Sequence, residues 1–303
     1  MAAEMSNLYY QKPLVITYSG GKDSDVLVNL AYECLDKDQF EVINNHTTVD
    51  APETVYHIRD VFCRLGEEGI KTTVMYPDKT MWELIVSNGV PPTRIARYCC
   101  KKLKESRIPN RFIATGVRSE ESSGRKNRDL FSIRAEKKSD AKFYSLKHAE
   151  EVFQESEDAR QELGLEPNDK DSFDCQLIEN AKLNNDLIVM PLYEWTFSDI
   201  WEYIKNRKLT VNKLYLMGYE RVGCVGCPMK NYAERMKDFI LFPKYKAAYI
   251  NAFQRMIDRK KSLGKPCTWA DGEACFDWWV DDPNIPGQMS IYDYMKGKGY
   301  DKS

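Results

Sequence analysis

A single stretch near the start of the chain decides the fold. Leu14–Ser24 reads LVITYSGGKDS and continues as DVLVNLA. The apolar, β-branched run predicts a buried strand, Gly20 and Gly21 predict a sharp turn, and the apolar residues after Ser24 predict a helix. Such a turn gathers free backbone N–H groups at a helix N-terminus, where anions bind, and Lys22 adds a positive charge. The stretch therefore predicts a phosphate-binding turn.

The spacing of the turn separates it from the two commonest phosphate loops. It lacks the four residues that a Walker A loop places between its first glycine and Gly-Lys, and it is not Gly-x-Gly-x-x-Gly. A purely structural turn is the alternative interpretation. In that case Lys22 is incidental, Asp23 is a favourable acidic residue in a first helical turn and Ser24 is a cap.

Composition excludes several classes of protein. The chain has 303 residues, 30% of them charged, and a formal net charge of −2, so bulk charge does not indicate a nucleic-acid binder. No apolar run approaches the roughly 18 residues of a membrane span, and Met1–Asn7 lacks the features of a signal peptide. A cytoplasmic protein without a membrane partner is expected.

Strand and helix patterns alternate along the chain, which predicts an α/β fold with a parallel, doubly wound sheet. Further strands are expected at residues 40–44, 71–76, 111–116 and 186–190, and helices at 52–65, 81–87 and 198–204. Residues 125–183 are polar and weakly periodic, and are interpreted as an insertion with a strand at 142–145 and a helix at 149–163. The expected domains are residues 10–230 and a mostly helical extension, 231–303, packed on them.

The positions of the nine cysteines are informative. Cys99 and Cys100 are adjacent, a poor geometry for a mutual disulfide, and Cys224 and Cys227 form a Gly-Cys-x-Gly-Cys-Pro turn. Together they offer four thiolates, suited to an iron–sulfur cluster or a structural zinc ion, with unligated thiols as a third interpretation. The remaining cysteines stand alone and are expected to be ordinary thiols: Cys34, Cys63, Cys175, Cys267 and Cys275.

The order of these motifs resembles the phosphoadenosine phosphosulfate (PAPS) reductase family, within the adenine nucleotide α-hydrolase fold of the N-type ATP pyrophosphatases. The turn matches the Ser-Gly-Gly-x-Asp-Ser loop of those pyrophosphatases. The matching segments are Ser19–Ser24, Asp50 with Pro52–Thr54, Cys99-Cys100, Gly116–Arg118, Pro191–Trp195 with Asp199–Trp201, and Gly223–Pro228. They run in family order over most of residues 10–230.

The resemblance implies a set of site residues. An adenine nucleotide would contact Ser19, Gly20, Gly21, Lys22, Asp23, Ser24, Asp50, Gly116 and Arg118, with Lys22, Asp23 and Arg118 in catalytic roles. Mg²⁺ would bind Asp23 or Asp50. Cys99, Cys100, Cys224 and Cys227 resemble the 4Fe–4S ligand set of adenosine phosphosulfate (APS) reductases, with zinc as the alternative metal.

Two departures from the reductases distinguish among the family's activities. The chain has no Glu-Cys-Gly-(Leu or Ile)-His segment, whose cysteine attacks sulfur in the reductases, and its loop is intact, as in members that use ATP. The implied function is an ATP-dependent sulfurtransferase that releases pyrophosphate and then transfers sulfur. The alternatives are an APS or PAPS reductase using Cys267 or Cys275 as nucleophile, and a non-catalytic nucleotide- and cluster-binding sensor.

Basic segments beside the motifs suggest an acceptor. They comprise Arg94, Arg97, Lys101, Lys102, Lys104, Arg107 and Arg111, and then Arg118, Arg125, Lys126 and Arg128. Both could follow a nucleic-acid backbone, and DNA phosphorothioation is the acceptor reaction that the resemblance suggests. The alternative is a solvated helix face. A sulfur donor such as a cysteine desulfurase is an implied partner, and a homodimer is compatible with the sequence.

Overall fold

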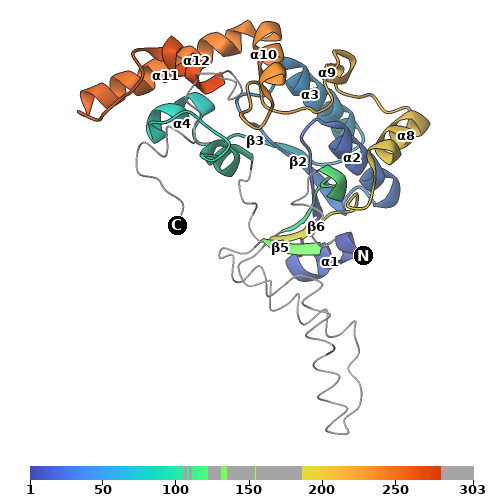
Figure 1. Cartoon of the computed structure of the whole chain (residues 1–303). Coiled ribbons are helices and arrows are strands. Elements are labelled where there is room, and N and C mark those ends of the chain that lie inside the picture. Colours follow the sequence, from blue (N-terminus) through green and yellow to red (C-terminus); the bar gives the residue numbers. More distant parts are fainter. Residues whose placement is uncertain (105–107, 109–110, 122–130, 135–153, 155–185, 281–303) are drawn as a thin grey trace. The chain divides into compact units, whose positions relative to one another are not determined.

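The computed structural model describes residues 1–104, 108, 111–121, 131–134, 154 and 186–280 (Figure 1). The chain divides into two compact units. The first comprises residues 1–46, 52–76 and 106–222, and the second comprises 47–51, 77–105 and 223–303. None of the helices in the described part of the chain has both the length and the apolarity that a membrane crossing requires.

The first unit is built on a six-stranded sheet with the order β3-β2-β1-β4-β6-β5. Its strands are β1 Leu14–Thr17, β2 Phe40–Asn45, β3 Thr72–Met75, β4 Phe112–Ala114, β5 Phe131–Arg134 and β6 Asp186–Val189. All neighbours pair in parallel except β5, which runs antiparallel to β6 at the edge. The α/β prediction is confirmed. The edge strand β5 was not foreseen, and the strand and helix expected at 142–145 and 149–163 lie outside the described residues.

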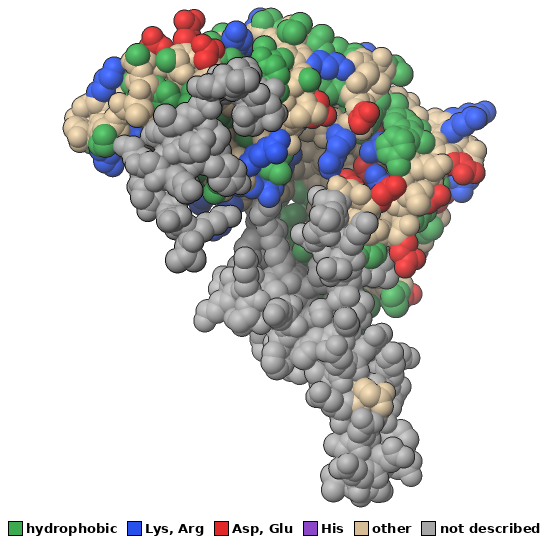
Figure 2. Space-filling model, viewed as in Figure 1, with side chains coloured by type: hydrophobic (Ala, Val, Ile, Leu, Met, Phe, Trp, Pro, Cys, Tyr) green, Lys and Arg blue, Asp and Glu red, His purple; other side chains and the backbone are tan. Residues whose placement is uncertain are grey.

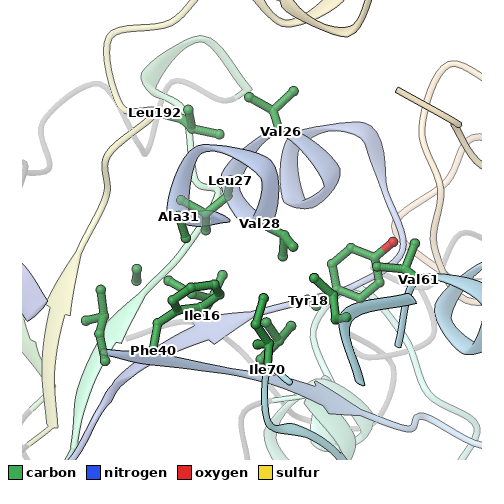
Figure 3. Packing of buried hydrophobic residues seen from close by; sticks show 14 of the residues in the cluster. Ile16, Tyr18, Val26, Leu27, Val28, Ala31, Phe40, Val61, Ile70 and Leu192 are labelled. Carbon is green, nitrogen blue, oxygen red and sulfur yellow. The ribbon is translucent and has the colours of Figure 1, made fainter. Parts of the chain in front are cut away.

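Helices cover this sheet because its strands are apolar on both faces. They are α1 Ala2–Tyr10, α2 Lys22–Cys34, α3 Pro52–Glu67, α8 Phe197–Arg207 and the short α9 Lys213–Leu216. Ile16 of β1 packs with residues of α2 and α3 in one cluster (Figure 3). Val15, the preceding residue, packs with Ile113 in another cluster. Alternate residues of a strand point to opposite faces, so the continuous apolar run in β1 is the signature of a sheet buried on both sides.

Strand order positions the phosphate-binding turn. The chain proceeds outward from β1 to β2 and β3, and β4 then pairs on the other side of β1. Ligands of such sheets bind outside the carboxyl ends of the strands where the order reverses. The turn after β1, Ser19–Gly21, begins there.

A buried ion-pair group ties β2 to its surroundings. Glu41 is 2% exposed and pairs with Arg111 and with Lys71, whose Nζ lies 2.8 Å from Oε2. Burial opposes ionisation, but hydrogen bonds from Lys71 and Arg111 lower the pKa of Glu41 below its ordinary 4.5. A lowered folded-state pKa means that the stabilisation is complete above about pH 4.5 and is lost as the pH falls through the folded-state value.

Glu41→Gln is therefore expected to lower the free energy of unfolding at pH 7 by about 2 kcal/mol, because it leaves Arg111 without its buried counter-ion. Urea unfolding at a series of pH values measures this, and the gap between wild type and variant should narrow below about pH 4.5. Glu68→Gln is the control, since Glu68 pairs with Lys37 at an exposed site. A gap that stays constant as the pH falls would contradict the assignment.

The second unit is helical in its described part. It contains α4 Met81–Asn88, a π-helical turn Cys100–Lys104, α10 Tyr232–Leu241, α11 Pro243–Ser262 and α12 Gly272–Val280 (Figure 1). α4 begins at a capping box, in which Thr80 Oγ1 accepts from Glu83 N. α11 packs against α4, α10 and α12. Their shared core is rich in aromatic rings, with Tyr249 and Trp279 at its centre.

Candidate active site

The turn after β1 has the backbone geometry of a phosphate-binding loop. Gly20 adopts φ +73°, and a Cβ there would lie 3.0 Å from Ile58, so glycine is needed at this position. Gly21 is the N-cap of α2. Ser24 Oγ accepts hydrogen bonds from the N–H groups of Ser19 and Gly21, at 3.3 and 3.2 Å. Rotation of this one hydroxyl would free two backbone donors at the positive end of a 13-residue helix.

The two cations predicted for this loop meet at a single carboxylate. Lys22 Nζ lies 3.1 Å from Asp23 Oδ2, and Arg118 Nε lies 2.6 Å from Asp23 Oδ1. Both Lys22 and Arg118 are only 3% exposed, so neither of their ion pairs with Asp23 is a surface salt bridge. Lys22 Nζ also lies 5.4 Å from the ring centroid of Phe197, within cation–π range. The structure therefore brings Lys22, Asp23 and Arg118 together, and their catalytic roles stay a prediction.

Arg118 is held in place by more than Asp23. Its Nη1 donates to Glu120 Oε2 at 2.9 Å and to the carbonyl oxygen of Trp195 at 3.3 Å. The same Glu120 oxygen accepts from Phe197 N, at the start of α8, at 2.6 Å. The charges of Lys22 and Arg118 are thus balanced by those of Asp23 and Glu120. An incoming phosphate gains the two cations only if these carboxylates give way or are themselves neutralised.

Gly116 lies against the same turn. A Cβ on Gly116 would lie 3.2 Å from the backbone carbon and oxygen of Asp23 and 3.4 Å from Ser24 N. The end of β4 and the start of α2 are therefore in close backbone contact. This contact is what Gly116 contributes to the predicted site, and it sets the distance between Arg118 and the loop.

Two loop contacts come from residues that the sequence did not identify. Asn212 is fully buried, and its Nδ2 donates to Gly20 O at 3.0 Å and to Thr54 Oγ1 at 3.1 Å. Lys22 N donates to Tyr215 Oη at 2.9 Å, and burial raises the pKa of Tyr215. Both residues lie almost 200 positions after the loop, and no short motif connects them to it.

The four predicted ligand cysteines share one core in the second unit. Cys99 and Cys224 are buried and Cys100 and Cys227 half-buried, all in the cluster around Tyr249. The Cys100 sulfur accepts hydrogen bonds from the Cys99 thiol, the larger effect, and from Arg97, and these lower the pKa of Cys100. Conversely, the shared hydrogen bond raises the pKa of Cys99, and burial raises that of Cys224.

A cation accompanies the cysteines. The nearby charges of Cys224, Cys227 and Cys100, together with Asp50, raise the pKa of Lys104, with Cys224 contributing most. Arg97 Nη2 lies 3.7 Å from Cys100 Sγ. Positive charge thus lies beside the Cys100 sulfur, which favours the ionised, metal-binding form of that thiol.

The Cys224–Cys227 turn is fixed by its neighbours. Gly226 adopts φ +68°, and a Cβ on it would lie only 2.6 Å from Phe239 Cζ. Gly226 N donates to the fully buried Asp238 at 2.7 Å, and Asp238 also pairs with Lys230 Nζ at 2.7 Å. Tyr249 Oη donates to Val225 O at 3.0 Å. These contacts hold the peptide groups between the two cysteines in one conformation.

Asp50, predicted to contact nucleotide or Mg²⁺, belongs to the second unit. Its Oδ2 accepts from Thr47 N at 2.9 Å, and its carbonyl oxygen accepts from Tyr245 Oη at 2.6 Å. The structure places its charge beside Lys104 and Cys224. Its role toward a nucleotide stays a prediction.

The basic segments divide into exposed and internal residues. Arg94, Arg97, Lys101, Lys102 and Lys104 are exposed, whereas Arg111 pairs with Glu41 and Arg118 with Asp23. Arg107, Arg125, Lys126 and Arg128 lie outside the described residues. On the face seen in Figure 2, basic side chains are interspersed with acidic and apolar ones.

The four predicted ligand cysteines offer a thiolate donor set. They lie in the cluster of residues around Tyr249, with Arg97 and Lys104 beside them. Thiolates are the ligands of iron–sulfur clusters and of structural zinc ions, so the residues present fit either group. The identity of the bound group stays a prediction.

The sequence was compared with a family profile and with curated proteins. The profile of the phosphoadenosine phosphosulfate reductase domain matches residues 13–230. An uncharacterized protein of Methanocaldococcus jannaschii is 24% identical over 255 residues, covering 84% of this chain and 44% of the relative. The adenosine 5'-phosphosulfate reductase of Oceanobacillus iheyensis is 49% identical over 39 residues, 13% of this chain and 16% of that protein.

The chain spans about half the length of this relative and of a second curated relative, which is also from Methanocaldococcus jannaschii. Among solved structures, the phosphoadenylyl-sulfate reductase of Candida auris superposes with a TM-score of 0.44 at 14% identity. The superposition covers 74% of this chain and 86% of that one.

Proposed function

The chain belongs to the phosphoadenosine phosphosulfate reductase domain family, and from this premise we propose that it is an ATP-dependent sulfurtransferase. One observation carries the proposal. The intact Ser19–Ser24 turn lies at the N-terminus of α2 with two buried cations, Lys22 and Arg118, on Asp23. Together with the positive end of α2, these two cations suit the phosphates of ATP once Asp23 and Glu120 give way or are neutralised.

The reaction proceeds in two displacements. An acceptor oxygen attacks the α-phosphorus of ATP, the bond to the β-phosphate breaks, and pyrophosphate leaves with the electron pair. A sulfur nucleophile then attacks the adenylated acceptor and expels AMP. The backbone N–H groups of the turn, freed when Ser24 Oγ rotates, would bind the leaving pyrophosphate together with Lys22.

Asp23 and Glu120 orient the site for this chemistry. Asp23 holds the Lys22 ammonium and the Arg118 guanidinium side by side, and Glu120 fixes the other edge of Arg118. Mg²⁺, when bound with ATP, would supply positive charge for the phosphates, and Asp23 is the loop carboxylate that could hold it. A four-iron cluster on Cys99, Cys100, Cys224 and Cys227, when bound, would supply a site that positions or binds sulfur.

We place the acceptor among nucleic acids. Arg94, Arg97, Lys101, Lys102 and Lys104 are exposed and lie on the segment that carries Cys99 and Cys100. Contacts from such side chains to phosphates are independent of sequence and sensitive to salt. A modified DNA backbone, as in phosphorothioation, is the proposed product. A cysteine desulfurase is the proposed source of sulfur.

Anaerobically purified protein tests the proposal with ATP, APS and PAPS as separate substrates. Pyrophosphate release from ATP, and transfer of labelled sulfur to added DNA or RNA, are expected. Lys22→Gln should lower the rate of pyrophosphate release by about 10- to 100-fold, because it removes a charge on the leaving group. Lys205→Gln on the exposed face of α8 is the matched control.

The same assay separates a second candidate function. The matched segment of an adenosine 5'-phosphosulfate reductase favours reduction of a sulfated nucleotide. Sulfite released from APS or PAPS in the presence of a thiol, without pyrophosphate release from ATP, would replace the sulfurtransferase by this reductase. Tight nucleotide binding without release of either product would support the third alternative, a non-catalytic nucleotide- and cluster-binding sensor.

A further inference from the structure

Arg235 on α10 is buried but incompletely paired. Arg235 is only 7% exposed, and its Nη1 donates a hydrogen bond to the carbonyl oxygen of Trp279 at 2.8 Å. Its guanidinium carbon lies 4.3 Å from the ring centroid of Trp279. Nε and Nη2 are buried and have no hydrogen-bond partner in the described part of the chain. Each such donor costs about 1–3 kcal/mol unless something accepts its hydrogen bond.

The same face of α10 contacts the cysteine turn. Asp238 and Phe239 follow Arg235 by three and four residues, the spacing that places side chains on one helix face. Asp238 accepts from Gly226 N at 2.7 Å, and Phe239 occupies the space beside Gly226. Arg235 therefore lies on the side of α10 that faces the segment between Cys224 and Cys227.

The neighbouring carboxylate of Asp238 does not pair with Arg235, because it is already paired with Lys230 and Gly226. Asp238 accepts from Lys230 Nζ with both oxygens, at 2.9 and 2.7 Å, and from Gly226 N. Burial lowers the pKa of Arg235 to about 10, and the charges of Tyr249 and Cys227 oppose this. The guanidinium is therefore still a cation at neutral pH. Its Nε and Nη2 have no hydrogen-bond partner among the described residues, and the neighbouring core holds four thiols.

We propose that Arg235 is a hydrogen-bond donor to the anionic sulfur of an iron–sulfur cluster on the Cys227 side, and that it sets the reduction potential of that cluster. This inference rests on the cluster of the proposed function. Thiolate and sulfide ligands make such a group net negative, so its sulfur atoms accept the hydrogen bonds that the polypeptide leaves unmade. A nearby cation and N–H···S bonds favour the reduced, more negative state and raise the potential.

The first test is the midpoint potential of the anaerobically reconstituted full-length protein. Arg235→Gln should make reduction about tenfold less favourable, which for a one-electron couple is about 59 mV more negative. Arg235→Lys keeps the charge without the planar fork and should fall between the two. Arg255→Gln, at an exposed arginine of α11, is the matched control and should leave the potential unchanged.

The second test separates this role from simple packing. In Arg235→Met the unpaired donors are gone, so the cluster-free protein should lose little stability, whereas the rise in Tm on cluster loading should be smaller than in wild type. An equal loss with and without the cluster would overturn the inference. So would full iron and sulfide content in Arg235→Gln with an unchanged potential, although the proposed function would then stand. Wild-type protein that takes up no iron and sulfide would overturn both.

Discussion

Arg118→Gln is expected to lower kcat/KM for pyrophosphate release by about 100- to 1,000-fold, the largest effect of any single change at the loop. Arg118 is 3% exposed and donates to Asp23 at 2.6 Å and to Glu120 at 2.9 Å. Glutamine removes the charge that would face the phosphates. It also leaves Asp23 and Glu120 without the cation that pairs with both of them.

Two variants make this prediction specific. Arg118→Lys keeps a positive charge but not the fork that contacts both carboxylates, and should recover part of the rate. Arg221→Gln removes an arginine that is 64% exposed in its side chain and lies 3.5 Å from Glu121, and should leave the rate unchanged. Breaking a buried pair also destabilises by about 3–5 kcal/mol, so rates are compared at a temperature where both variants are folded. A folded Arg118→Gln protein with the wild-type rate would remove Arg118 from the mechanism.

Gly226→Ala is expected to destabilise the second unit by about 2–5 kcal/mol. The left-handed backbone at φ +68° costs an alanine about 1–2 kcal/mol. Overpacking adds about 1–3 kcal/mol, because the new Cβ would lie 2.6 Å from Phe239 Cζ and 3.2 Å from Tyr249 Cε2. The change should also displace Cys224 and Cys227, so the iron content after anaerobic reconstitution should fall with the stability.

Gly223→Ala provides the matched control for this glycine. It lies in the same segment, but a Cβ there would meet nothing within 4 Å and the residue is not in the left-handed region. Urea unfolding and iron analysis of both variants should therefore separate the two glycines clearly. Equal, small losses for both would mean that the turn adapts and that Gly226 is not needed to present the cysteines.

The sheet and the loop could be predicted because their signals are local. Leu14–Ile16 is a continuous apolar run, and Gly20 and Gly21 follow it within five residues. Lys22 and Asp23 belong to the loop itself, whereas Arg118 was assigned to the same site only through the family resemblance. The antiparallel β5 was missed because its alternation of apolar and polar residues, Phe131–Arg134, is only four residues long and lies in a polar, weakly periodic stretch.

The supports of both sites could not be predicted, because they arrive from distant parts of the chain. Asn212 and Tyr215 hold the loop, and Asp238 holds the cysteine turn, yet none of them belongs to a recognisable short motif. Charge runs misled for a related reason. Arg111 and Arg118 look like members of basic surface segments, but burial and pairing, which depend on tertiary packing, place both inside the first unit.

The contacts between α10 and the Cys224–Cys227 turn determine where the chain can be truncated or joined to a related chain. The family match ends at residue 230, after the last of the four cysteines. A fragment truncated there would keep all four cysteines but would lose Asp238, Phe239 and Tyr249, which fix the Cys224–Cys227 turn. Chimeras with other family members should therefore exchange α10 and α11 together with that turn, because residues of these two helices hold the turn in its conformation.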